Sequence, residues 1–284
     1  MKNDLLLTDD LFRKKVLRDL DWLVSSPLIL ESEGVAQLQN KMREAVTRFL
    51  GRDPERLFRM LSRPEPRLPL GRWFERVFLA ALQITFPFAE IFHSVSDESG
   101  GELDFLIVES HLTTHIECAV KFFLRNPALG SGLESYVGPG GRDRLDLKYH
   151  KMRDLQLRRD VPAQYNPSGR VKKVLWMSGM IHEPLMHGAF RTPGFTVPPM
   201  SASVATGYWA TPAEVMESLL PGEELYMLPR QWWVTDLTGL SLQDFENFKR
   251  FSAESTVSEA VMTVRVKFDG ERSAEFARGF IISR

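Results

Sequence analysis

The sequence of 284 residues predicts a mixed α/β protein that begins with helices and ends in a β-rich part. Apolar residues recur at helical spacing near the N-terminus, which is typical of amphipathic helices. Two strand-like runs, a helix-like segment and a further apolar run follow. Beyond Pro184, short apolar strands alternate with two helices that carry N-terminal capping signals. This order indicates a mixed sheet flanked by helices.

Three helices are expected before the sheet. The first begins at Thr8-Asp9-Asp10 and ends at Ser25-Ser26-Pro27. The second covers 35–50, with an apolar stripe on one side. After a proline-rich connector, a third helix runs over 70–86 and contains Glu75.

The middle of the chain is expected to form the sheet. Strands are predicted over 102–108 and 114–123, joined by a short turn. A helix is predicted over 143–157 and a buried strand over 171–178.

The C-terminal part is expected to contain short strands over 203–209, 224–228 and 232–237, helices that start at Thr211 and Ser241, and a hairpin around Asp269-Gly270. We therefore predict an N-terminal helical segment (1–69), an α/β core (70–183) and a C-terminal extension packed on it (184–284).

Composition limits the class of protein. Charged residues make up 26% and the formal net charge is −1, so binding to nucleic acid would depend on a local basic patch. Cys118 is the only cysteine, which excludes an intramolecular disulfide and favours a reducing compartment. No apolar run approaches the ~20 residues of a membrane helix. We expect a cytoplasmic protein without a membrane partner.

The two central strands carry acids in otherwise apolar runs. Because side chains alternate along a strand, His115, Glu117, Ala119 and Lys121 share one face. The hairpin would bring Asp104 close to Glu117, within reach of one divalent cation. Two carboxylates with water suit Mg²⁺, and Mn²⁺ is the alternative. A nearby lysine would orient a bound water.

These residues resemble the PD-(D/E)XK, or restriction-endonuclease-like, superfamily of nucleases. Its core is a helix, a hairpin carrying Asp and Glu-x-Lys, a further strand, a helix and a last strand. The resemblance covers about residues 70–180. It implies metal ligation by Asp104 and Glu117, a catalytic role for Lys121, and assistance from Glu75 on the preceding helix. It also implies a nucleic-acid substrate, and a homodimer is compatible with it.

Four segments together resemble, more narrowly, an uncharacterised bacterial family built on a domain of unknown function that has been grouped with these nucleases. This resemblance covers nearly the whole chain. Its segments are Trp73-Phe74-Glu75, Gly101-Glu102-Leu103-Asp104-Phe105-Leu106, Ala119-Val120-Lys121-Phe122, and the stretch from Gly138-Pro139 to Leu147.

The spacing of the lysine departs from the superfamily pattern. Three residues separate Glu117 from Lys121, whereas the pattern has one, and Ala119 stands at the expected position. The two would be roughly 13 Å apart along an ideal strand. A bulge could shorten this gap, or Lys148 on the next helix could reach the site instead.

A basic segment follows the glycines at 138–141. Arg142, Arg144, Lys148 and Lys151 could contact a phosphate backbone without reading sequence. The alternative is a solvated helix face on which acids pair with these bases.

Three hypotheses follow from the sequence: a magnesium-dependent nuclease, a non-catalytic relative that binds nucleic acid or a protein, and a structural protein in which Glu117 and Lys121 pair with Asp104 or Arg142.

Overall fold

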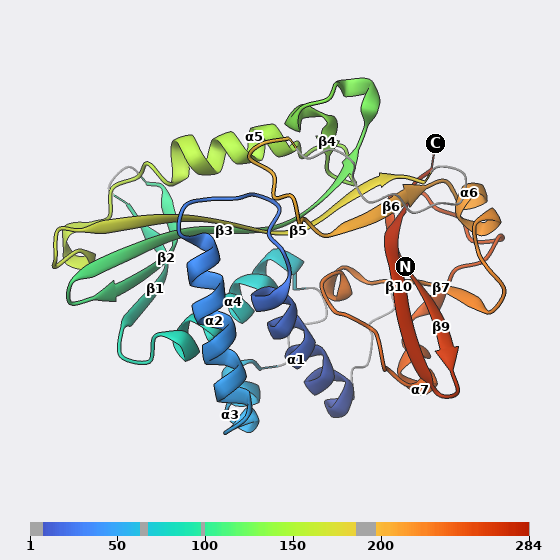
Figure 1. Ribbon diagram of the computed structural model, residues 1–284, viewed down its shortest axis with the longest axis horizontal. Helices are drawn as coiled ribbons and strands as arrows, with labels where there is room; N and C mark the ends of the chain where they lie inside the picture. The colour runs from blue at the N-terminus through green and yellow to red at the C-terminus, as the bar shows by residue number, and fades with distance from the viewer. Residues whose placement is uncertain (1–7, 63–67, 98–99, 186–196, 284) are drawn as a thin grey trace.

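The computed structural model describes residues 8–62, 68–97, 100–185 and 197–283. A mixed sheet of ten strands runs through the molecule (Figure 1). Helices α1, α2 and α4 lie below this sheet in the view of Figure 1, and α5 lies above it. The mixed α/β class predicted from the sequence is confirmed.

The N-terminal helices are α1 (Asp9–Ser25), α2 (Val35–Leu50), α3 (Pro54–Met60) and α4 (Leu70–Thr85). The Thr8 hydroxyl caps α1 by accepting from the Leu11 amide at 3.2 Å. The short helix α3 was not predicted, although Asp53 caps it and Pro54 opens it. Among the described residues, no helix combines the length and apolarity needed to cross a membrane.

Three antiparallel strands lead into a parallel pair. These are β1 (Glu90–Ser96), β2 (Glu102–Glu109) and β3 (Leu112–Arg125), followed by β5 (Val171–Pro184) beside β3. The two-residue strand β4 (Tyr136–Val137) pairs with the end of β3. Strand β1 was not predicted, because its burial does not alternate regularly along the strand.

The helix predicted over 143–157 consists of two parts. The first is α5 (Leu145–His150), and the second is η3 (Lys151–Gln156), a π-helical segment. The Leu157 amide donates to the Met152 carbonyl at 2.9 Å, five residues back. Shorter 3₁₀ turns are η1 (Pro127–Leu129), η2 (Leu133–Ser135), η4 (Ala163–Tyr165) and η5 (Arg230–Trp232).

The C-terminal part continues the same sheet. Its strands are β6 (Thr206–Ala210), β7 (Glu223–Met227), β8 (Lys249–Arg250), β9 (Val261–Asp269) and β10 (Arg272–Ile281), with helices α6 (Pro212–Glu217) and α7 (Leu242–Phe245). Strand β6 is parallel to both β5 and β10, so it links the two ends of the sheet. The strand predicted over 232–237 is wrong, since η5 and a loop occupy that stretch. The division at residues 69 and 183 stays a prediction.

Strand β3 divides the core into two layers. Its residues Ile116, Cys118 and Phe122 belong to the same core cluster as helix α4. On the opposite face, Ala119 packs in a cluster with Met152 of η3 and other residues around α5. The face that carries Glu117 is therefore the one that α5 and η3 cover.

A buried polar network ties three distant segments together. Asp19 of α1 accepts from the Trp73 indole of α4 at 2.6 Å and from the Thr235 hydroxyl at 2.5 Å. It also pairs with Lys15, and neither side chain is more than 1% exposed. A buried charge is costly without a partner, and Asp19 compensates the charge of Lys15. Its other two hydrogen bonds link α1 to α4 and to the C-terminal part.

We expect Asp19→Ala to destabilise the protein by about 3–5 kcal/mol, because it leaves the Lys15 ammonium group buried without a partner. Chemical denaturation would measure this loss. The control is Asp21→Ala on the same helix, since Asp21 is exposed. Equal effects of the two substitutions would contradict the importance of this network.

Candidate functional site

Asp104 and Glu117 meet where strands β2 and β3 separate. The last backbone pair in this direction joins Phe105 to Ile116. Beyond this pair, the Cys118 amide of β3 donates to a side chain of β2: its nitrogen lies 2.8 Å from Asp104 Oδ2. The two carboxyl groups come within hydrogen-bonding reach of each other. The structure thus brings together the two acids that the sequence predicted as metal ligands.

Neutral side chains hold the Glu117 carboxylate at both oxygens. His115 Nε2 lies 2.9 Å from Oε1, and the Gln156 amide donates to Oε2 at 2.7 Å. The side chains of His115 and Glu117 are fully buried. Within the described residues, no lysine or arginine forms an ion pair with Asp104 or Glu117. Pairing of these acids with Lys121 or Arg142, which the hypothesis of a structural protein required, is absent there.

Burial governs the charge state of these groups. It raises the pKa of Glu117 to about 7. Burial, followed by the charge of Glu117, raises the pKa of Asp104 to about 6. Burial, with the positive charge of Lys173 next, lowers the pKa of His115 to about 4, so this imidazole is uncharged at neutral pH. Both shifts favour the protonated forms of the two carboxyl groups when no cation is bound.

Two lysines lie near the acids, in different environments. Lys121, the lysine predicted to be catalytic, donates to Asp143 at 2.7 Å. The side-chain amine of Lys148 in α5 forms no hydrogen bond or ion pair with any residue that the structure describes. Burial lowers the pKa of Lys148 and Lys121 adds to this, whereas the charges of Asp104 and Glu117 act in the opposite direction. The Lys148 amine is therefore unpaired among the described residues, and its charge acts on both acids.

Glu75 lies at the margin of the site. Its carboxylate pairs with Arg72 at 3.0 Å and is 41% exposed. Burial raises the pKa of Glu75, the hydrogen bond from Arg72 lowers it, and the charges of Asp104 and Glu102 raise it further. Glu75 is close enough to influence Asp104 without contacting it.

The predicted phosphate-binding residues differ in their partners. Arg142 and Lys151 are exposed. Arg144 donates through Nε to Asp146 at 2.8 Å, as the alternative of a solvated, self-paired helix face had suggested. Lys148 is half-buried.

Sequence reasoning missed Gln156 and Arg159. Gln156 could not be found, because the π-helical segment changes which residues face the sheet. Arg159 donates to the Glu102 carbonyl at 2.7 Å and pairs with Asp97 at 3.2 Å. Gly101 permits this, since a Cβ there would come within 2.3 Å of the Arg159 side chain. His115 could have been proposed, because alternation places it on the same face as Glu117.

The donors at this site fit a magnesium-type cation better than a zinc-type one. No group of three or more His, Cys, Asp or Glu side chains among the described residues is arranged to hold a metal ion. A cation here would rely on two carboxylates, with other oxygens and waters completing its shell. Mg²⁺ is commonly bound in this way.

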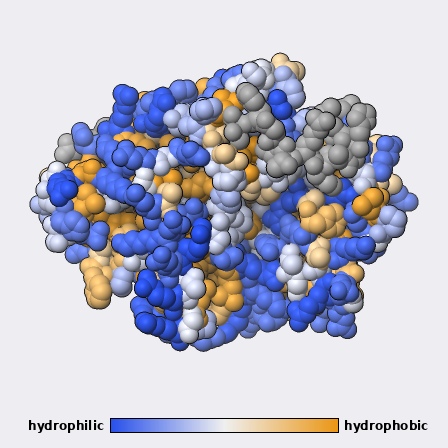
Figure 2. All heavy atoms as spheres, in the orientation of Figure 1, coloured by the Kyte–Doolittle hydropathy of each residue, from blue (hydrophilic) through white to orange (hydrophobic). Residues whose placement is uncertain are grey.

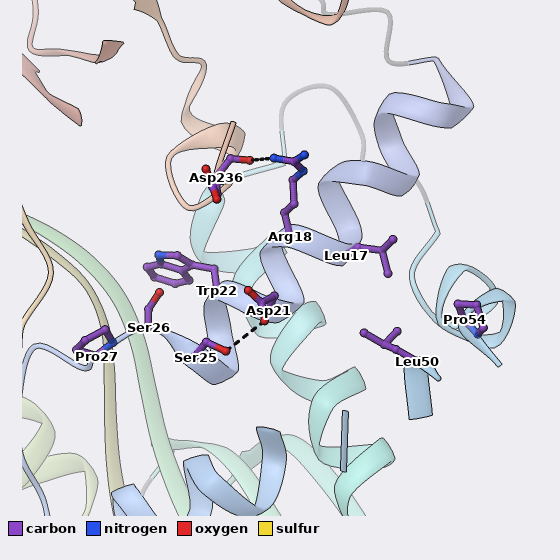
Figure 3. A pocket seen from close by; sticks show the side chains of 10 residues that line it. All are labelled: Leu17, Arg18, Asp21, Trp22, Ser25, Ser26, Pro27, Leu50, Pro54 and Asp236. Carbon is purple, nitrogen blue, oxygen red and sulfur yellow. Dashed lines mark hydrogen bonds between the residues drawn. The ribbon is translucent and has the colours of Figure 1, made fainter. Parts of the chain in front are cut away.

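A separate groove of about 750 Å³ lies on the side of the N-terminal helices, between α1, the end of α2, the start of α3 and Asp236 (Figure 3). Figure 2 shows an apolar patch among hydrophilic side chains where α1 and α2 lie. The polar groups in the groove are already engaged: Arg18 donates to the Asp236 carbonyl at 2.5 Å, and Ser25 donates to Asp21 at 3.2 Å. We assign no chemistry to this groove.

Asp104→Asn is expected to stabilise the metal-free protein at high pH. The folded pKa of Asp104 is raised from its ordinary 3.8 to about 6, so its stabilising contribution is complete below 3.8 and is lost as pH rises through about 6. An amide avoids this loss and still accepts from the Cys118 amide. At pH 8 with a chelator, the free energy of unfolding should rise by about 1–3 kcal/mol.

Denaturation at pH 8 and near pH 4 measures this gain, which should vanish at the lower pH. The matched control is the exposed Asp160→Asn, which should change little at either pH. A gain that is the same at both pH values would contradict the electrostatic strain inferred for Asp104.

Comparison with known proteins gives one match. No curated protein and no solved structure matches the chain. The sequence profile of a domain of unknown function, DUF1853, matches residues 18–282. This range contains every acid, lysine and hydrogen-bonding residue of the candidate site. The chain therefore belongs to the DUF1853 family.

Proposed function

We propose that this protein is a divalent-metal-dependent phosphodiesterase that acts on nucleic acid. The observation that carries the proposal is the pair of neighbouring carboxylates, half-buried Asp104 and fully buried Glu117, held by neutral hydrogen-bond donors. Buried charges in proteins are paired or bind metals. A structural ion pair would have supplied a lysine or arginine, and the described residues supply none to either acid.

The arrangement of elements around the site supports the nuclease hypothesis. Helix α4 precedes three antiparallel strands, of which β2 and β3 form the hairpin that carries Asp104 and Glu117. Helix α5 follows, and β5 returns parallel to β3. The first helix, the hairpin, the second helix and the last strand are elements that the resemblance to the PD-(D/E)XK superfamily led us to expect, whereas the additional long strand, β1, precedes the hairpin and was expected after it.

The proposed roles follow from position. Asp104 and Glu117 would hold Mg²⁺ or Mn²⁺, which lowers the pKa of a bound water and offsets charge on the phosphodiester. Lys148 is half-buried, its amine has no hydrogen-bonding partner among the described residues, and it would orient the attacking water. The water oxygen would bond to phosphorus as the ester P–O bond breaks, and the leaving oxygen would take up a proton. Exposed Arg142 and Lys151 would contact flanking phosphates.

A non-catalytic protein that binds nucleic acid is the second candidate. The observation in its favour is the ion pair between Lys121 and Asp143, which removes the lysine of the expected motif from the acids. Metal uptake without cleavage of any nucleic acid would favour this candidate.

Metal binding is the first test. Calorimetry with Mg²⁺ and Mn²⁺ should show uptake by the wild-type protein and a loss of affinity of about tenfold or more in Asp104→Asn and Glu117→Gln, because each removes an anionic ligand. Asp160→Asn serves as the control. Absence of uptake by the wild-type protein would overturn the proposal.

Cleavage assays separate the two lysines. With Mn²⁺ and labelled single- and double-stranded DNA and RNA, Lys148→Met should lower the rate by about 10²-fold or more, since it removes the amine that positions water. Lys121→Met should have a much smaller effect. If Lys121→Met has the larger effect, Lys121 must leave Asp143 and enter the site when substrate binds.

A further inference from the structure

The Glu117 carboxylate is fixed more firmly than metal binding alone requires. Each of its oxygens has its own donor, His115 on one side and Gln156 on the other, at 2.9 and 2.7 Å. His115 stands two residues before Glu117 on the same strand, so its position is set by β3 itself. Gln156 belongs to η3, in the helical layer that covers this face of the sheet. Glu117 is therefore clamped between the sheet and η3.

The π-helical segment explains how Gln156 reaches the carboxylate. Met152, fully buried, anchors η3 against the sheet, and the five-residue hydrogen bond from Leu157 to Met152 inserts an extra residue into the turn. Gln156 lies at the end of this widened turn. Such π-segments are rare and are found frequently at functional sites.

Two buried atoms of the clamp have no partner among the described residues. They are His115 Nδ1 and Gln156 Oε1. Leaving such atoms unpaired costs free energy, which a purely structural arrangement would be expected to avoid. The clamp thus holds Glu117 in one orientation at a cost to stability.

A fixed carboxylate discriminates between cations. Mg²⁺ requires near-ideal octahedral geometry at short distances, whereas Ca²⁺ accepts six to eight oxygens and carboxylates that bind through one oxygen or two. A glutamate side chain that cannot rotate suits Mg²⁺ and hinders the changes of coordination that Ca²⁺ binding uses. We propose that His115 and Gln156 are positioning residues that make this site select Mg²⁺ over Ca²⁺. This inference rests on the proposed metal site.

The test compares the affinities of the full-length protein for Mg²⁺ and for Ca²⁺ by calorimetry. In Gln156→Leu, Mg²⁺ affinity should fall by about tenfold or more, as is typical when a residue that orients a ligand is lost. Ca²⁺ affinity should fall by less than about threefold, since Ca²⁺ tolerates a mobile carboxylate. Gln164→Leu, at an exposed position in η4, is the matched control and should change neither.

A second pair of variants guards against loss of folding. His115→Leu removes the other donor and should lower the ratio of Mg²⁺ to Ca²⁺ affinity, whereas His115→Gln keeps a donor and should restore it. Thermal unfolding identifies any variant that is not folded. A wild-type protein that binds both ions, with a ratio unchanged in all folded variants, would overturn the selectivity and leave the metal site intact. A wild-type protein that binds neither ion would overturn the metal site itself.

Discussion

The candidate site depends on two neighbouring carboxyl groups, half-buried Asp104 and fully buried Glu117, which receive hydrogen bonds but form no ion pair with any residue that the structure describes. Glu117 is fully buried and receives its hydrogen bonds from His115 and Gln156. Asp104 receives one from the Cys118 amide. Neutral donors orient a carboxylate and leave its charge available. In the metal-free protein, burial penalises that charge and raises both pKa values, which favours protonation of the carboxyl groups.

The two carboxyl groups are positioned by the packing of helical segments on both faces of the sheet. Helix α4 covers one face of the sheet, and its Phe78 ring packs against Phe105 and Trp176 with centroids 5.2 and 5.1 Å away. That packing fixes β2 and β5 on either side of β3. On the other face, η3 closes over Glu117. The network around Asp19 joins α1 to α4 and to Thr235 in the C-terminal part.

Much of the fold could be predicted from the sequence. Helix α2 has the predicted boundaries, and the hairpin of β2 and β3 lies where the apolar runs and the turn indicated. Local signals sufficed there because periodicity and capping act over a few residues. Strand β1 escaped prediction because its exposed and buried residues do not alternate.

The sequence predicted the two acids of the site and offered Lys148 as an alternative to Lys121. Alternation along β3 placed Glu117 on a face, and hairpin geometry placed Asp104 near it. Which lysine serves the site could not be decided from the sequence, because it depends on the conformation of a loop. Lys121 donates to Asp143 in that loop, whereas Lys148 of α5 is the lysine whose charge acts on the acids. Gln156 depends on a π-helical turn that no spacing rule anticipates. Long-range packing, which a single sequence does not display, decides these contacts.

The most direct measurement is a crystal structure of the protein soaked in Mn²⁺, with anomalous scattering used to locate the metal. The account predicts a manganese peak between Asp104 and Glu117, with carboxylate oxygens from both within about 2.0–2.3 Å, a typical metal–oxygen range. Crystals that contain Mn²⁺ in solution but show no peak there, and in which a lysine or arginine is paired directly with either carboxylate, would contradict it.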